Sequence, residues 1–136
     1  ILDIPDYIKI ENNANKAMVV STAAITASGT ATLECAIEEL PTIVCYKMSS
    51  ISWTIAKYLT NLKYSSIVNI IADKEIFPEF LQDKMNTNLI LKKLESLLAA
   101  NSIERKTMIE DLQQIKISLG NPGVYDRIAK SIIKRH

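Results

Sequence analysis

The sequence predicts an α/β layer structure in which helices flank a parallel sheet and a helical C-terminal tail follows. Two observations indicate this class: apolar segments typical of buried strands alternate with helical repeats up to residue 100, and only helical repeats come after it. The chain has 136 residues, of which 48% are apolar, so it is long enough to form a core. We expect one domain over residues 1–100 and C-terminal helices over 101–136.

A strand, helix, strand unit is predicted in the first part of the chain. The elements expected there are, in order, a strand or extended segment over 1–11, a short helix over 16–21, a strand over 23–27, a helix over 31–40 and a strand over 42–46. Pro41 ends the second helix because proline cannot continue it. Residues 42–46 are β-branched and apolar, which is typical of a central parallel strand.

The second part of the chain is predicted to be mainly helical. The elements expected are an amphipathic helix over 51–62, a strand or extended segment over 63–69, a short helix over 79–81 with Pro78 in its first turn, a helix over 87–100, a helix capped by Asn101 that carries Met108, Leu112, Ile115 and Leu119, and a basic helix after Gly123. Glu104, three residues after Asn101, would complete a capping box.

Charge and cysteine content exclude several classes of protein. Sixteen basic against fifteen acidic residues give a net charge of +1, too small for the field that non-specific nucleic-acid binding needs. Cys35 and Cys45 are too few for a disulfide framework, so we expect reduced thiols that pack as small apolar groups. The uncharged stretch 17–33 carries too many hydroxyl groups for a membrane span.

Gly29 marks the turn that is best suited to hold a ligand. It is the only glycine before residue 120, it lies between Ser28 and Thr30, and it falls where a strand ends and a helix begins. A phosphate could approach the main chain there and meet the free N–H groups of the helix start. Glu34, one turn later, suits the vicinal hydroxyls of a ribose. A plain helix cap at Gly29 and a solvated first-turn acid at Glu34 stay open as alternatives.

Four segments in succession carry a resemblance to a known family. They are residues 28–34 (Ser-Gly-Thr-Ala-Thr-Leu-Glu), 41–47 (Pro-Thr-Ile-Val-Cys-Tyr-Lys), 64–71 (Tyr-Ser-Ser-Ile-Val-Asn-Ile-Ile) and 78–82 (Pro-Glu-Phe-Leu-Gln). In order and spacing the sequence resembles the C-terminal half of the lipid-A-disaccharide synthases. The resemblance implies a Rossmann-like sheet with flanking helices, as in the C-terminal half of a GT-B glycosyltransferase.

The resemblance also implies a binding site for a UDP-sugar donor. Ser28, Gly29 and Thr30 would meet the diphosphate and Glu34 the ribose. Asn69, in an Asn-aliphatic-aliphatic motif, would line the donor site, and Glu79 and Gln82 are weaker candidates beside it. No catalytic residue, metal or cofactor is expected in this chain.

The implied reaction is inverting, metal-independent glycosyl transfer in lipid A biosynthesis. A diacylglucosaminyl group would pass from UDP-diacylglucosamine to diacylglucosamine 1-phosphate. An N-terminal domain, absent from this sequence, would supply the acceptor site and general base, so we expect this chain to be inactive alone. A UDP-sugar epimerase-like domain and a non-catalytic interaction domain are the alternatives.

Location and assembly are expected from the same resemblance and from the basic tail. We expect a cytoplasmic protein that is peripheral on the cytoplasmic face of the inner membrane, can assemble as a homodimer and has no nucleic-acid partner. Four basic residues crowd the C-terminal tail: Arg127, Lys130, Lys134 and Arg135. The tail would either lie on an anionic membrane surface or dock against the missing domain.

Overall fold

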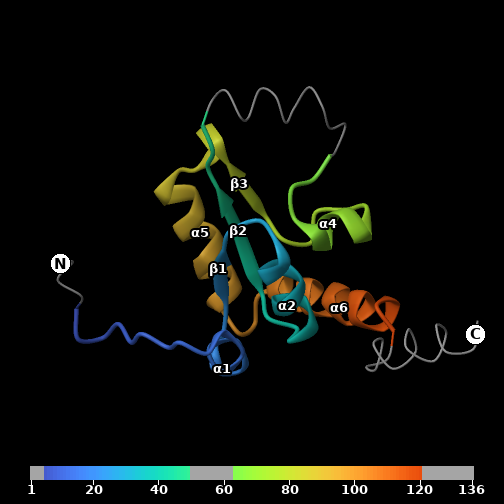
Figure 1. Cartoon of the computed structure of the whole chain (residues 1–136), viewed down its shortest axis with the longest axis horizontal. Helices are drawn as coiled ribbons and strands as arrows, with labels where there is room; N and C mark the ends of the chain where they lie inside the picture. The colour runs from blue at the N-terminus through green and yellow to red at the C-terminus, as the bar shows by residue number, and fades with distance from the viewer. Residues whose placement is uncertain (1–4, 50–62, 121–136) are drawn as a thin grey trace, which may run out of the picture.

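Three short strands form one parallel sheet in the computed structural model, which describes residues 5–49 and 63–120. The strands are β1 (Ala24–Thr26), β2 (Thr42–Tyr46) and β3 (Glu79–Leu81), in the spatial order β1-β2-β3 (Figure 1). Thr26 of β1 is level with Val44 of β2, which is level with Glu79 of β3. The predicted α/β class and the central position of residues 42–46 are therefore confirmed.

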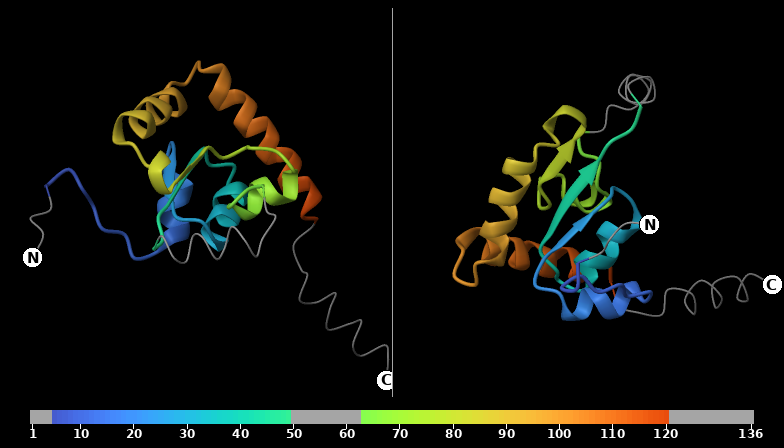
Figure 2. Two further views of the ribbon diagram at one scale, coloured as in Figure 1. Left: turned by 90° about the horizontal axis from the view of Figure 1, so that it is seen from above. Right: turned by 90° about the vertical axis from the view of Figure 1, so that its left-hand side faces the viewer.

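Helices lie on both faces of this sheet. They are α1 (Ala14–Val20), α2 (Thr30–Ile37), α4 (Ile67–Ala72), the 3₁₀ turn η1 (Gln82–Lys84), α5 (Thr87–Leu98) and α6 (Ile103–Ser118). Helix α5 lies on one face of the sheet, whereas α2 and α4 lie on the other (Figures 1 and 2). Helix α6 packs against α2, α4 and α5, so it joins the two helical layers.

Apolar side chains from both layers form the core. Ile43 and Val44 of β2 are fully buried, because helices cover both faces of the central strand. The remaining core side chains are Cys35, Ala36, Leu40, Val68, Ile76, Phe77, Leu97, Met108, Leu112 and Ile115. The burial of the last three confirms most of the apolar repeat predicted for the helix after residue 101, whereas Leu119, its fourth member, is exposed at the end of α6.

Both cysteines are free thiols, as predicted. Cys35 is buried on α2 and Cys45 is half-buried in β2. Burial raises the pKa of both thiols. Among the described helices, none combines the length and the apolar character that crossing a membrane requires.

The strand or extended segment predicted over 63–69 is wrong from Ile67 onwards, because Ile67 begins helix α4. Ser66 caps this helix, and its hydroxyl accepts a hydrogen bond from the Asn69 N–H at 3.2 Å. The helix buries Val68 and Asn69 and leaves Ile70 and Ile71 largely exposed. A short apolar run fits the strand period and the helix period equally well, and here the serine cap decides between them.

The short helix predicted over 79–81 is also wrong, because these residues form strand β3. Proline suits the first turn of a helix, but it also occurs where a strand begins. The carbonyl oxygen of Pro78 accepts a hydrogen bond from the N–H of Val44 at 2.9 Å, which starts the pairing with β2. A tertiary contact thus overrides the local preference.

The cap predicted for the last described helix is displaced by one residue. Ser102 rather than Asn101 is the N-cap of α6, and its hydroxyl accepts from the N–H of Arg105. The Glu104 carboxylate does not close a capping box. It instead accepts hydrogen bonds from Lys93 and Ser96, which ties α6 to α5. The helices predicted over 51–62 and after Gly123 lie outside the described residues.

Acid is expected to weaken the contact between α2 and α6. Hydrogen bonds from Lys116 (2.8 Å) and Gln113 (3.1 Å) hold the pKa of the Glu39 carboxyl below its ordinary value of 4.5. A lowered folded-state pKa contributes stability above the ordinary value, and this stability is lost as the pH falls through the folded value. For this exposed pair the loss is about 0.5 kcal/mol at most.

Chemical denaturation of the wild-type chain and of Glu39→Gln between pH 6 and pH 3 measures this loss. The glutamine variant lacks the ionisation, so the difference in unfolding free energy between the two proteins should shrink as the pH falls. Curves that run parallel over the whole range would contradict the assigned role of Glu39.

Candidate functional site

The turn between β1 and α2 opens onto free space. Gly29 is the N-cap of α2, with φ 144° and ψ −161°, and it makes no side-chain cap. A Cβ placed on Gly29 would meet no atom within 4 Å. Among the described residues, none accepts a hydrogen bond from the main-chain N–H of Thr30 or Ala31. These amides lie at the start of a helix, where free N–H groups suit an anion.

Two serines that lie far apart in the sequence bridge this turn to the loop before α4. The Ser28 hydroxyl donates to the carbonyl oxygen of Ser65 at 2.8 Å. The Ser65 hydroxyl donates in return to the Ser28 hydroxyl oxygen at 3.0 Å. The separation of 37 positions in the sequence makes this a tertiary contact that fixes the turn beside α4.

The Glu79 carboxylate, at the start of β3, holds the loop before α4 from the other side. It accepts hydrogen bonds from the N–H of Ser65 at 2.8 Å, from the N–H of Ser66 at 2.8 Å and from the Asn69 side-chain amide at 2.8 Å. We refer to Ser28, Ser65, Ser66, Asn69 and Glu79 as the Glu79 network. It joins the ends of β1, α4 and β3 at one place.

Asn69 is fully buried, and every polar atom of its side chain has a partner. Its amide nitrogen also donates to the carbonyl oxygen of Phe77 at 2.7 Å. Its amide oxygen accepts from the N–H of Ile76 at 2.8 Å and of Phe77 at 2.9 Å. Asn69 therefore holds the chain that leads into β3, and it connects that chain to the Glu79 network.

The structure brings some of the predicted site residues together and leaves others apart. Ser28, Asn69 and Glu79 come together in the Glu79 network, and Gly29 and Thr30 follow Ser28 directly. Glu34 is exposed on α2, one turn after Thr30.

Gln82 takes a different position, at the end of β3. With its amide oriented to satisfy both groups, Gln82 donates to the carbonyl oxygen of Met48 at 3.1 Å and accepts from the Met48 N–H at 3.1 Å. Gln82 therefore fixes the chain that leaves β2.

Ser65 is the member of the site that the sequence reasoning missed. Its neighbour Ser66 is a readable helix cap, but nothing in the local pattern announces a contact between Ser65 and Ser28. Ser65 lies in the segment 64–71 on which the family resemblance rests, and that is the only signal that could have found it.

A hollow of about 380 Å³ lies beside the Glu79 network. Glu79, Gln82 and Tyr64 line it, together with the basic side chains of Lys63 and Lys84 and the acidic side chains of Glu75 and Asp83. Three carboxylates thus accompany two ammonium groups, so the charge of this hollow does not favour an anionic ligand. Among the described residues, no cluster of three His, Cys, Asp or Glu side chains could hold a metal ion.

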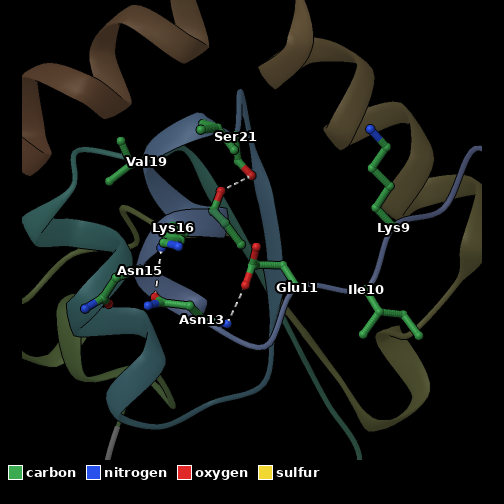
Figure 3. A pocket seen from close by; sticks show the side chains of 10 residues that line it. Lys9, Ile10, Glu11, Asn13, Asn15, Lys16, Val19 and Ser21 are labelled. Carbon is green, nitrogen blue, oxygen red and sulfur yellow. Dashed lines mark hydrogen bonds between the residues drawn. The ribbon is translucent and has the colours of Figure 1, made fainter.

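A second hollow, of about 810 Å³, lies between the N-terminal arm and α1 (Figure 3). Lys9, Ile10 and Glu11 line it from the arm, and Lys16 and Val19 line it from α1. It contains none of the predicted donor-site residues, so it is separate from the Gly29 turn.

The fold and the Gly29 turn define the class of this chain. A parallel α/β sheet with an open, glycine-containing turn at the carboxyl end of a strand is typical of nucleotide-binding domains. A family model described as Lipid-A-disaccharide synthetase matches residues 3–127. The chain belongs to this family, as the resemblance indicated.

Curated relatives agree with this assignment. The chain is 41% identical over 115 residues to the lipid-A-disaccharide synthase of Rickettsia prowazekii, covering 85% of this chain and 30% of that protein. It is 35% identical over 127 residues to that of Syntrophus aciditrophicus, covering 93% of this chain and 33% of that protein. The chain thus spans about a third of the length of these relatives.

Proposed function

We propose that this chain is the donor-binding part of a lipid-A-disaccharide synthase and that it binds the UDP group of UDP-diacylglucosamine at the Gly29 turn. The observation that carries this proposal is the uncapped start of α2, where free amides and an absent side chain face open space. Membership of the family supplies the ligand class.

The Gly29 turn suits the leaving group of a glycosyl transfer. Negative charge develops on the diphosphate as the sugar departs, and fixed N–H dipoles stabilise such charge without having to reorganise. The main-chain amides of Thr30 and Ala31 and the exposed hydroxyl of Thr30 would supply these contacts. This is the basis for proposing an inverting transfer that needs no divalent metal.

The complete reaction would also require an acceptor site and a general base. A further domain would bind the acceptor, diacylglucosamine 1-phosphate, and would supply the general base that activates its hydroxyl group. We assign donor binding to the domain of residues 1–100. The helices of 101–136 would pack against this donor-binding domain. Attachment to the cytoplasmic face of the inner membrane through the basic tail, and assembly as a homodimer, belong to the same proposal.

A chimera tests the proposed reaction. The segment of the Rickettsia prowazekii synthase that matches this chain would be replaced by residues 1–136, and the product would be analysed after incubation with both acylated substrates. We expect the disaccharide. A folded chimera that yields only an epimerised UDP-sugar, or that yields no product although it binds UDP, would contradict the proposal.

The Glu34 carboxylate is expected to bind the ribose of UDP. Removing it by Glu34→Ala should weaken UDP binding about fivefold, which corresponds to one hydrogen bond of about 1 kcal/mol. Isothermal titration calorimetry of the chain with UDP measures this change. The matched control is Glu38→Ala, which removes an exposed carboxylate at the other end of the same helix and should leave the affinity unchanged.

The 2′-deoxy analogue of UDP makes this prediction specific. The wild-type chain should bind the analogue more weakly than UDP, whereas Glu34→Ala should bind the two ligands equally. An undiminished preference for UDP in Glu34→Ala would show that another group reads the ribose.

A further inference from the structure

We infer that Ser65 is a positioning residue that sets the Gly29 turn in its binding geometry by holding Ser28. The inference rests on the proposed function, since the turn is the proposed diphosphate site. It differs from the role first predicted for Ser28, which was direct contact with the ligand.

The Ser28 hydroxyl has only one hydrogen to donate, and the structure commits it to the carbonyl oxygen of Ser65. The oxygen of Ser28 in turn accepts the hydroxyl hydrogen of Ser65. In this arrangement Ser28 has no hydrogen left for a phosphate oxygen. Its hydroxyl therefore anchors the turn, and contact with the diphosphate is left to the amides and the hydroxyl that follow Gly29.

Ser65 can act as an anchor because it is itself held firmly. Its N–H donates to both oxygens of Glu79, at 3.0 Å and 2.8 Å, and the N–H of Ser66 donates to the same carboxylate. Glu79 is held in turn by the fully buried Asn69. Hydrogen bonds thus connect Ser28 through Ser65 to β3 and α4, which belong to the packed part of the chain.

Removal of the Ser65 hydroxyl tests this role without touching the proposed ligand contacts. We expect Ser65→Ala to weaken UDP binding about threefold to tenfold, as the loss of one hydrogen bond would, while Ser65→Thr, which keeps a hydroxyl, restores most of the affinity. Ser118→Ala is the control, because it removes a serine hydroxyl that also donates a hydrogen bond, here to the Ile115 carbonyl at the end of α6. It should leave the affinity unchanged.

The ligand-free protein gives a readout that separates positioning from direct contact. In ¹H–¹⁵N NMR spectra recorded without UDP, Ser65→Ala should shift the amide signals of Gly29 and Thr30 and speed their hydrogen exchange. A residue that only touched the ligand would leave these ligand-free signals in place.

A double-mutant cycle completes the test. Once Ser28→Ala has removed the anchored group, adding Ser65→Ala should cost no further affinity, because the Ser65 hydroxyl acts only through the Ser28 hydroxyl. Additive losses, or wild-type affinity in Ser65→Ala, would overturn the positioning role and leave the proposed function intact. If the wild-type chain shows no UDP-induced shift at all, the proposed function fails and this inference fails with it.

Discussion

Replacing Gly29 with alanine is expected to weaken UDP binding about tenfold or more. With φ 144° and ψ −161°, Gly29 occupies a backbone region that is almost restricted to glycine, and a side chain there costs about 1–3 kcal/mol. The new methyl group would project into the open space in front of α2, where the diphosphate is proposed to lie. Both effects act on the turn itself, so the loss should exceed that of any single hydrogen bond.

The second glycine of the described chain provides the control for strain. Gly120 also has a positive φ, 79°, and also faces open space, but it follows α6. Gly120→Ala should lower the midpoint of chemical denaturation and leave the UDP affinity unchanged. Equal affinity losses in the two variants would mean that the Gly29 effect comes from general destabilisation and not from the proposed site.

Replacing Asn69 with alanine is expected to reduce the free energy of unfolding by about 3–5 kcal/mol, since each polar group left buried without a partner costs about 1–3 kcal/mol. Its side chain is the hydrogen-bond partner of the N–H groups of Ile76 and Phe77, of the Phe77 carbonyl and of the Glu79 carboxylate. This is the largest stability loss we expect from any polar substitution in the site.

Urea denaturation followed by circular dichroism measures the Asn69 effect. Asn88→Ala, which truncates an exposed asparagine on α5, is the matched control and should change the stability by less than about 0.5 kcal/mol. If Asn69→Ala proved as mild as the control, the buried amide would not hold the chain before β3 as described.

The strand, helix, strand unit could be predicted because each of its signals is local. Residues 42–46 are β-branched and apolar, Pro41 ends the preceding helix, and Gly29 is the only glycine near the turn. These residues constrain their own backbone, so local preference and the final fold agree. The same reasoning located the open turn, which is the centre of the proposed site.

One of the two mistaken elements depends on a contact that a local pattern does not contain, and the other depends on a single serine cap. Residues 79–81 become a strand because Val44 lies alongside Glu79, although Pro78 before them also suits a helix start. Residues Ile67–Ala72 form a helix, although their short apolar run fits a strand equally well. For residues 79–81 the decisive partner lies elsewhere in the sequence. For Ile67–Ala72 the neighbouring Ser66 cap decides.

The Glu79 network could be predicted only in part, because its contacts join residues that lie far apart in the sequence. Ser28, Asn69 and Glu79 were each identified by resemblance, but their connection passes through Ser65, 37 residues after Ser28. Asn69 was expected to line the site, and the structure places it in the interior, where it holds the main chain. Its residue type was informative, whereas its direction required the packed fold.

Titration of the wild-type chain with UDP, followed residue by residue in ¹H–¹⁵N NMR spectra, tests the central claim most directly. We expect saturable shifts that centre on the amides of Gly29, Thr30 and Ala31 and extend to Glu34. Unchanged signals at this corner with UDP at millimolar concentration, or shifts confined to the hollow between the N-terminal arm and α1, would contradict it.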